Sequence, residues 1–257
     1  MKYKWLIGIL CITTVAVVVF FLVEKKKPEN NDLPVIDTEF IVPEDTAKQE
    51  KNTLQPQNQN KIFHNLVNIH DIDNTILIDL KYASTDNFME IALYENLDGA
   101  YFQPDVAQML AAAHSYLKTL HPDLRLLVYD AVRPLSVQRL MWEKVRYTKF
   151  SLYVASPDNL SLHNFGAAVD LTIANQMGQS LDMGTPFDYF GRAAGISNEP
   201  LLIEQGILTL QQVQNRELLR QVMRHAGFRA VSGEWWHFNA CSLREAMQRY
   251  TLVEDFI

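Results

Sequence analysis

Residues 5–23, WLIGILCITTVAVVVFFLV, restrict the fold of this chain more than any other stretch. They form an uncharged, almost wholly apolar run of 19 residues, and a membrane-spanning helix needs about 20 such residues. Lysines flank the run on both sides, and no small-residue cleavage site follows it, which favours an uncleaved anchor over a signal peptide. We therefore expect a membrane anchor over residues 1–23 that takes no part in the globular fold.

Residues 24–60 have the composition of a linker. They include KKKPENNDLP and KQEKNTLQPQNQNK, which are rich in Lys, Asn, Gln, Glu and Pro and poor in large apolar side chains. Such a segment cannot bury enough apolar surface to offset the entropy lost on ordering. We expect a disordered linker there and one globular domain over residues 61–257, a length that suits a single domain.

The net charge and the cysteine content limit which partners and which disulfides can be expected. The net charge is −7, which provides no basic patch for nucleic acid. Cys11 lies in the apolar run and Cys241 in the domain, so no disulfide within the folded domain is expected. We expect a membrane-anchored protein whose globular domain is periplasmic or otherwise extracytoplasmic, and which is attached to the membrane through the N-terminal helix. Neither nucleic acid nor an obligate protein partner is expected.

Helical and strand patterns are mixed along the domain. Apolar residues at steps of three and four after Pro104 predict a helix to about residue 120, and further helices are expected over 135–146 and 215–225. Strands are expected over 75–80, 124–129 and 168–173, and residues 228–231 and 235–238 suggest a hairpin. Because strands and helices do not alternate regularly, we expect an α+β fold with a largely antiparallel central sheet flanked by helices.

One of these strands carries a carboxylate. Asp170 lies within AVDLTI, where burial is costly unless the group is paired or bound to a metal. With His163 in the polar loop before it and His237 further on, it completes a nitrogen and oxygen ligand set that suits zinc and leaves a fourth position for water. Each residue also has an ordinary interpretation, since a histidine among aromatics is more often packed and a strand aspartate can bond a turn.

The stretch GEWWHF, residues 233–238, places Glu234 three residues before His237. Its aromatics after Ser232 and Gly233 favour a strand that follows a tight turn. Residues three apart in a regular strand face opposite sides, so both side chains could reach one site only through a bulge or if Glu234 lies before the strand. Glu234 would then be a carboxylate beside the metal that is not a ligand, with the tryptophans packed around the site.

These stretches together resemble a known family. SLHNFGAAVD followed by EWWHF is similar to the S-x-H-x-x-G-x-x-x-D and E-x-x-H pair of the zinc D-alanyl-D-alanine dipeptidases of the vancomycin-resistance type and their housekeeping relatives. LKYASTDNF at 80–88, YDAVRP at 129–134 and MGTPFDYF at 183–190 also fit, in the same order, over about residues 70–240. The resemblance implies the fold shared by hedgehog-type domains and D,D-peptidases.

The resemblance assigns roles to eight residues of this sequence. It implies one zinc per chain held by His163, Asp170 and His237, with Glu234 and Arg133 as catalytic residues and Tyr82, Ser161 and Asp188 lining the substrate pocket. Glu234 would be the general base and acid, Arg133 would lie near the scissile carbonyl, and Asp188 would face the substrate ammonium. Val132 departs from the family, where that position is often aromatic.

The implied activity is zinc-dependent hydrolysis of the dipeptide D-alanyl-D-alanine to two D-alanines. One alternative is a zinc D,D-carboxypeptidase or endopeptidase that acts on peptidoglycan stem peptides, which would need an open groove. The other is a zinc-stabilised binding module without catalysis, for which a base such as Glu234 would have no use.

Overall fold

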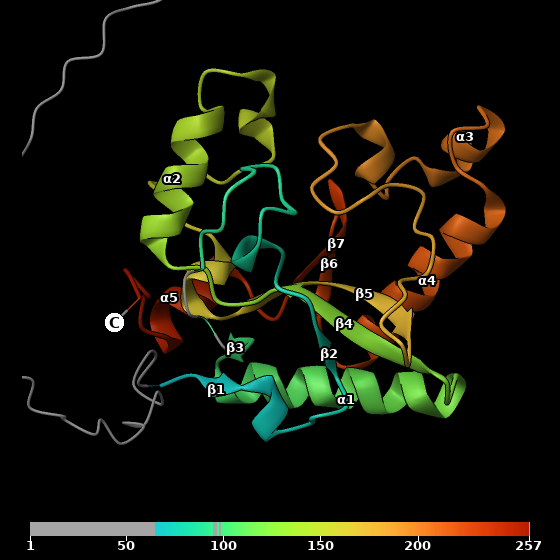
Figure 1. The fold of residues 1–257 in the computed structure, drawn as a ribbon, viewed down its shortest axis with the longest axis horizontal. Coiled ribbons are helices and arrows are strands. Elements are labelled where there is room, and N and C mark those ends of the chain that lie inside the picture. The colour runs from blue at the N-terminus through green and yellow to red at the C-terminus, as the bar shows by residue number, and fades with distance from the viewer. Residues whose placement is uncertain (1–64, 95–96, 98, 257) are drawn as a thin grey trace, which may run out of the picture. The chain divides into compact units, whose positions relative to one another are not determined.

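The computed structural model describes residues 65–94, 97 and 99–256, and within them the dominant element is a five-stranded mixed sheet (Figure 1). Its strand order is β2-β4-β5-β7-β6; β2 pairs with β4 in parallel, and the other three pairings are antiparallel. The strands are β2 (Leu77–Ile78), β4 (Leu124–Asp130), β5 (Ala168–Asn175), β6 (Arg229–Val231) and β7 (Glu234–Asn239). The predicted α+β class and its largely antiparallel sheet are confirmed.

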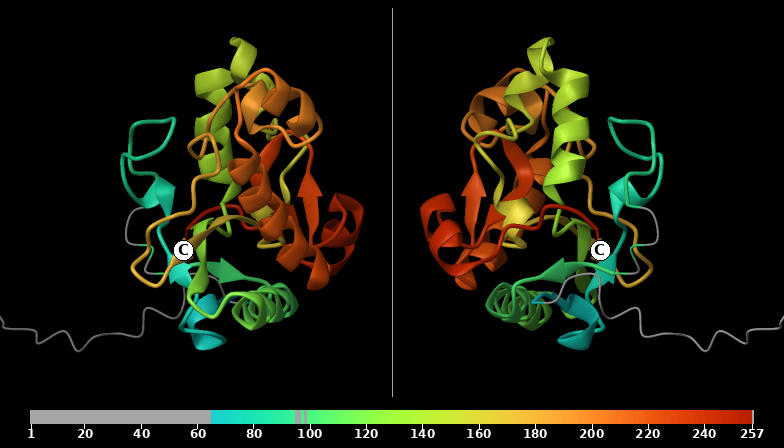
Figure 2. Two further views of the ribbon diagram at one scale, coloured as in Figure 1. Left: turned by 90° about the vertical axis from the view of Figure 1, so that its right-hand side faces the viewer. Right: turned by 90° about the vertical axis from the view of Figure 1, so that its left-hand side faces the viewer.

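Helices lie on both sides of this sheet. Helix α1 (Pro104–Leu120) contacts β4 and α4 (Leu210–His225), and α4 also contacts β5 and β6. Figures 1 and 2 show α2 (Leu135–Val145) on the opposite side of the sheet from α1. The remaining elements are β1 (Val67–Asn68), β3 (Tyr101–Phe102), α3 (Glu199–Glu204), α5 (Leu243–Arg249), η1 (Ile69–Asp71), η2 (Lys81–Ala83), η3 (Lys149–Leu152), η4 (Leu162–Phe165) and η5 (Arg192–Ala194).

Strand β5 separates the hydrophobic core from the polar face of the sheet. Successive side chains of a strand point to opposite faces, so Leu171 and Ile173 share one face while Asp170 and Thr172 share the other. All four are buried, and the two apolar side chains belong to the core cluster. Cavities are lined by Asp170 and by Thr172 but by neither core residue, which places the functional face of the sheet on the Asp170 side.

Most predicted elements are found within about two residues of their expected ends, and two differ. Helix α4 begins five residues earlier than the predicted residue 215, because Thr209 and Gln212 form a capping box that starts the helix before its apolar stripe. The strand predicted over 75–80 is reduced to Leu77–Ile78, since the chain turns into the 3₁₀ helix η2 directly afterwards.

The predicted membrane localisation is corrected by the structure. Among residues 65–94, 97 and 99–256, no helix is long and apolar enough to cross a membrane, and the longest, α1, has 17 residues with an amphipathic pattern. Membrane anchoring is therefore not supported. The anchor over 1–23 and the linker over 24–60, on which that prediction rested, lie outside the described residues.

Leu110 and Leu120 of α1 differ in burial, so they should differ in their contribution to the stability of the fold. Leu110 is fully buried, whereas Leu120 is 39% exposed. Leu110→Ala should lower the free energy of unfolding by about 2 to 5 kcal/mol, because it removes buried methyl groups and leaves a cavity. Leu120→Ala should cost less than about 1 kcal/mol. Urea denaturation of both variants tests this, and equal losses would contradict the assignment of the buried face.

Candidate metal centre

Three predicted ligands meet above the sheet. His163 lies on η4, Asp170 on β5 and His237 on β7, and one donor atom from each lies within 4.8 Å of the others. Asp170 Oδ1 lies 3.0 Å from His237 Nδ1 and 3.4 Å from His163 Nε2, and the two imidazole nitrogens are 3.3 Å apart. Asp170 and His237 are direct partners in the β5–β7 register, so the sheet itself brings them together.

The two histidines are oriented by hydrogen bonds on the far sides of their rings. His163 Nδ1 lies 2.6 Å from the carbonyl oxygen of Ala131, which requires that nitrogen to carry the proton. His237 Nε2 lies 2.9 Å from Asn239 Oδ1, and this amide oxygen likewise accepts a hydrogen bond. The other nitrogen of each ring faces Asp170, in the way that outer hydrogen bonds orient metal-binding imidazoles. Burial acts to lower the pKa of His237, but in the metal-free protein Asp170 outweighs it and raises that pKa to about 9. A proton therefore occupies the place beside Asp170 that a metal ion would take.

The environment of Asp170 suits a carboxylate that binds a cation. Its Oδ1 is buried and accepts no hydrogen bond, a costly state for an ionised oxygen. Burial acts to raise the pKa of Asp170, but His163 and His237 outweigh it and hold that pKa well below its usual range. The site thus contains a carboxylate kept ionised and two imidazole nitrogens aimed at one point, a donor set that fits a divalent transition metal.

A short capped turn positions His163. Ser161 accepts a hydrogen bond from the His163 backbone amide through its hydroxyl, and the Asn164 side chain accepts one from the Ser161 amide, which closes a capping box. Gly166 ends the turn with φ of 63°, and a Cβ there would lie 3.1 Å from Leu66 and 3.3 Å from a backbone nitrogen. The glycine therefore lets the chain pass from the turn directly into β5.

The geometry of GEWWHF is resolved by a bulge. Ala230 lies opposite Phe238, whereas the next residue of β6, Val231, lies opposite Glu234. Three residues of β7 are thus inserted relative to β6, and the two-residue alternation is broken. Glu234, the first residue of β7, lies with its Oε2 3.8 Å from His237 Nδ1. The predicted departure from a regular strand is confirmed, and burial, aided by the Asp170 charge, raises the pKa of Glu234 to about 7.

Arg133 is held by a buried network at the end of β4. Its Nε and Nη2 donate to Asp130 Oδ2 at 2.9 and 2.5 Å, and its Nη1 donates to Gln138 Oε1 at 3.1 Å. Tyr94 donates its hydroxyl to the other Asp130 oxygen at 2.6 Å. Arg133 Nη2 also lies 3.4 Å from Asp170 Oδ2. The guanidinium is therefore fixed beside the ligand cluster with its charge already paired.

Asp188 lies across the pocket in a polar pair with Tyr82. The Tyr82 hydroxyl lies 3.1 Å from both Asp188 oxygens, and the Phe88 amide donates to one of them at 3.5 Å. Burial, together with the Asp170 charge, raises the pKa of Asp188 from 3.8 to about 8. Asp188 itself has a φ of 57°, a backbone conformation uncommon for residues other than glycine. A cation placed beside Asp188 would stabilise the ionised form of this carboxyl group.

One cavity of about 330 Å³ is lined by all eight residues that the sequence singled out. Side chains from α2 and η3 form part of its wall, and the segment that carries Asp188 forms another part. The aromatic side chains of Phe88 and Tyr153, which also line the cavity, each pack against Phe190, with ring centroids 5.0 and 5.1 Å apart. Trp236 lines the cavity as expected, but Trp235 does not.

Several residues of the site did not emerge from the sequence. Asp130, Tyr94 and Gln138 hold Arg133, and Asn239 orients His237. Asp130, in YDAVRP at 129–134, carried the same signal as Asp170, because each is an aspartate that belongs to a largely apolar strand. Nothing in the local sequence distinguishes the other three, because their partners come from distant elements.

Two histidines and an aspartate that could hold a metal ion, with a further carboxylate, a fixed arginine and a small pocket beside them, are the features of a metal-dependent hydrolase. The chain belongs to peptidase family M15, described as D-ala-D-ala dipeptidase, which matches residues 63–253. This confirms the family resemblance stated from the sequence.

Individual relatives agree with the family assignment. The chain is 31% identical over 191 residues to the D-alanyl-D-alanine dipeptidase of Escherichia coli K12, a match that covers 74% of this chain and 91% of the relative. Dipeptidases of the same name from Synechocystis sp. and Enterococcus faecium are each 29% identical, over 57% and 66% of this chain and 71% and 88% of the relatives.

The raised pKa of Asp188 predicts a pH-dependent stability. Between pH 4 and pH 8 the folded protein holds a proton on this carboxyl that the unfolded chain releases, so the carboxyl destabilises the fold increasingly as pH rises. Asp188→Asn should raise the melting temperature of the metal-free protein at pH 8 and change it little at pH 4.5. Thermal unfolding at the two pH values measures this.

Asp182 provides the control on the same segment. Hydrogen bonds from Gln212 and the Gly184 amide lower the pKa of Asp182, so its charge stabilises the fold at pH 8. Asp182→Asn should therefore lower the melting temperature at pH 8. A rise with both variants would show a general effect of removing negative charge and would contradict the assignment to Asp188.

Proposed function

We propose that this protein hydrolyses the dipeptide D-alanyl-D-alanine to two D-alanines with one zinc ion per chain, and that its catalytic domain is the segment 61–257. The main support is the cavity of about 330 Å³. Its lining includes the three candidate metal ligands and also Glu234, Arg133 and Asp188. This volume lies at the lower end of the range of about 300 to 1,000 Å³ for ligand pockets, as a small substrate requires.

His163, Asp170 and His237 would hold the zinc. Two imidazoles and one carboxylate leave a coordination position for water or substrate, as in other catalytic zinc sites. A zinc ion held there would supply a bound water whose pKa is lowered from near 16 to about 7, and would polarise a carbonyl oxygen. The unsatisfied Oδ1 of Asp170 is the atom that such an ion would satisfy.

Glu234 would act as general base and then general acid. It is not one of the three clustered ligands, yet its Oε2 lies 3.8 Å from His237 Nδ1. With a pKa raised to about 7 by burial, its carboxyl group can accept a proton from the attacking water and return it to the leaving amine near neutral pH.

Arg133 would stabilise the negative charge that develops on the carbonyl oxygen. Asp130 and Gln138 fix the guanidinium, so no reorganisation is needed as this charge appears. Loss of one such preorganised donor commonly costs about 100- to 1,000-fold in rate.

Asp188 would bind the substrate ammonium, with Tyr82 and Ser161 lining the same pocket. A free dipeptide carries its ammonium one residue from the scissile bond, and a buried carboxylate in a small cavity selects that arrangement. Binding of the ammonium would also convert Asp188 from its protonated form to a paired anion.

Replacement of Glu234 separates catalysis from metal binding. Glu234→Ala should retain one zinc per chain and lower kcat/KM for D-Ala-D-Ala by about 100- to 10,000-fold, the usual contribution of a positioned base. The control is Glu245→Ala, which removes a carboxylate from the cap of α5 and should leave turnover unchanged. Metal analysis and a D-alanine release assay measure both quantities, and full turnover in Glu234→Ala would refute its role. A wild-type protein that binds zinc but releases no D-alanine would instead favour the binding-module alternative.

Substrate length distinguishes the dipeptidase from a stem-peptide carboxypeptidase or endopeptidase. A pentapeptide has no ammonium near its C-terminal bond, so the buried Asp188 would remain unpaired when it binds. We expect kcat/KM for D-Ala-D-Ala to exceed that for a stem pentapeptide by more than about 100-fold. Preference for the pentapeptide would overturn the dipeptidase proposal but leave the zinc site intact.

A further inference from the structure

A single buried arginine ties together the two ends of the segment that carries Asp188. Arg216 of α4 is fully buried and donates its Nε to the carbonyl oxygen of Met183 at 2.7 Å and its Nη2 to that of Ala193 at 2.9 Å. Its Nη1 lies 3.5 Å from Glu199. Asp188 is five residues from each of the two carbonyls, so one planar guanidinium closes the base of the segment that presents this carboxylate.

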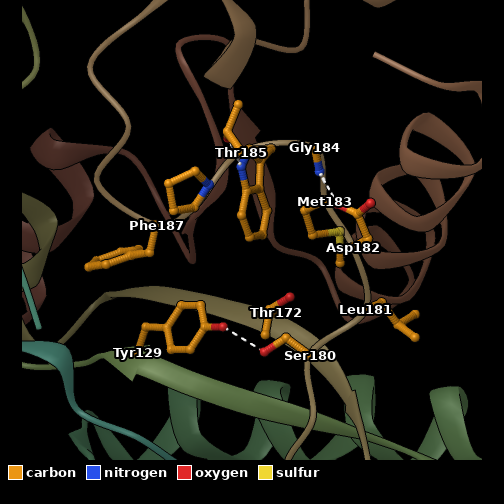
Figure 3. A pocket seen from close by; sticks show the side chains of 11 residues that line it. Tyr129, Thr172, Ser180, Leu181, Asp182, Met183, Gly184, Thr185 and Phe187 are labelled. Atoms are coloured by element: carbon orange, nitrogen blue, oxygen red, sulfur yellow. Dashed lines mark hydrogen bonds between the residues drawn. The ribbon is translucent and has the colours of Figure 1, made fainter. Parts of the chain in front are cut away.

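The middle of this segment lies over a cavity. This cavity, of about 330 Å³, has Tyr129 and Thr172 on its floor and Thr185 and Phe187 above them (Figure 3). On either side of it the segment contacts the sheet, since the Leu181 amide donates to the Ile173 carbonyl oxygen at 2.8 Å and the Phe187 ring lies 5.3 Å from that of Tyr129. Because close packing is what normally fixes a buried segment, the residues between these contacts depend more on their polar ties.

The other polar ties converge on the same helix and on the strand of the catalytic glutamate. Gln212 and Asn215 of α4 donate to the side chain and the carbonyl of Asp182, each at 2.8 Å. Trp235 donates its indole nitrogen to Thr185 at 2.8 Å, and the Arg216 guanidinium lies 5.9 Å from the Trp235 ring centroid. Arg216 thus joins the Asp188 segment to β7, which carries Glu234 and His237.

We propose that Arg216 is a positioning residue for substrate recognition, which fixes the distance between Asp188 and the metal centre and so sets the preference for a short substrate with a free ammonium. This inference rests on the proposed function, since Asp188 is the group that would bind that ammonium. Arg216 touches neither substrate nor ligands and acts through the two carbonyls it holds.

Arg220, one turn further along α4, is a matched control. It is 8% exposed and donates to both oxygens of Glu199, at 3.0 and 2.8 Å, and to Glu217. It therefore shares the helix, the charge and the acidic partner of Arg216, but its hydrogen bonds within the described part of the chain go to Glu199 and Glu217 and to no carbonyl of residues 183–193. A lysine at either position keeps a positive charge near Glu199. At position 216, however, lysine cannot replace the planar guanidinium that donates to two carbonyls at once.

The test compares Arg216→Lys and Arg220→Lys in the zinc-loaded protein. Arg216→Lys should raise KM for D-Ala-D-Ala by at least about tenfold with a smaller change in kcat, because a misplaced carboxylate weakens ammonium binding. KM for N-acetyl-D-Ala-D-Ala, which lacks the ammonium, should not change. Arg220→Lys should leave both KM values unchanged. Equal effects of the two variants, or equal effects on both substrates, would overturn the proposal.

A second measurement does not depend on turnover. Amide hydrogen exchange of residues 184–192 should accelerate in Arg216→Lys and not in Arg220→Lys, and unchanged exchange would overturn the proposal even if the dipeptide is not a substrate. If Arg216→Lys does not fold, Asn215→Ala removes one tie at the same base and should accelerate exchange in the same residues to a smaller extent. Failure of the wild type to hydrolyse D-Ala-D-Ala would instead refute the proposed function.

Discussion

The site depends on one unfavourable element, an ionised carboxylate on a buried strand. Asp170 is 2% exposed, its Oδ1 accepts no hydrogen bond, and its charge is sustained by two imidazoles and an arginine. A buried charge of this kind is tolerated only if it is paired or bound to a metal. The surrounding polar groups meet this requirement, because each histidine directs one ring nitrogen toward Asp170 and Arg133, held by Asp130, lies beside it.

The need to place polar groups beside Asp170 also explains the backbone geometry of β7 and η4. Strand pairing places His237 opposite Asp170, but regular alternation would then turn Glu234 to the other face. The inserted residues of β7 release it into the cavity, which is a recurrent use of bulges beside active sites. The capped turn of η4 likewise brings His163 to the end of β5, and Gly166 allows the chain to reverse there without a steric clash.

The sequence predicted elements with a strong period or a punctuating residue, such as α1 after Pro104, and it predicted a bulge from the spacing of Glu234 and His237. It could not predict interactions set by distant segments. Gln138 and Arg216 are examples, because a hydrogen bond to a buried guanidinium and a pair of loop carbonyls leave no local pattern. The candidate ligands His163, Asp170 and His237 could be named from the sequence because one metal ion would explain all three. The localisation was inferred from residues 5–23 alone, and no helix among the described residues supports it.

X-ray absorption at the zinc edge of the metal-loaded protein identifies the metal ligands themselves. We expect one zinc per chain with nitrogen and oxygen neighbours at about 2.0 to 2.1 Å, two imidazoles among them, and no sulfur. Cys241 is a buried free cysteine of the described residues, and coordination by its thiol would indicate a different site. A sulfur neighbour at about 2.3 Å, or a coordination shell unchanged by His237→Ala, would contradict the assignment of His163, Asp170 and His237 as the metal ligands.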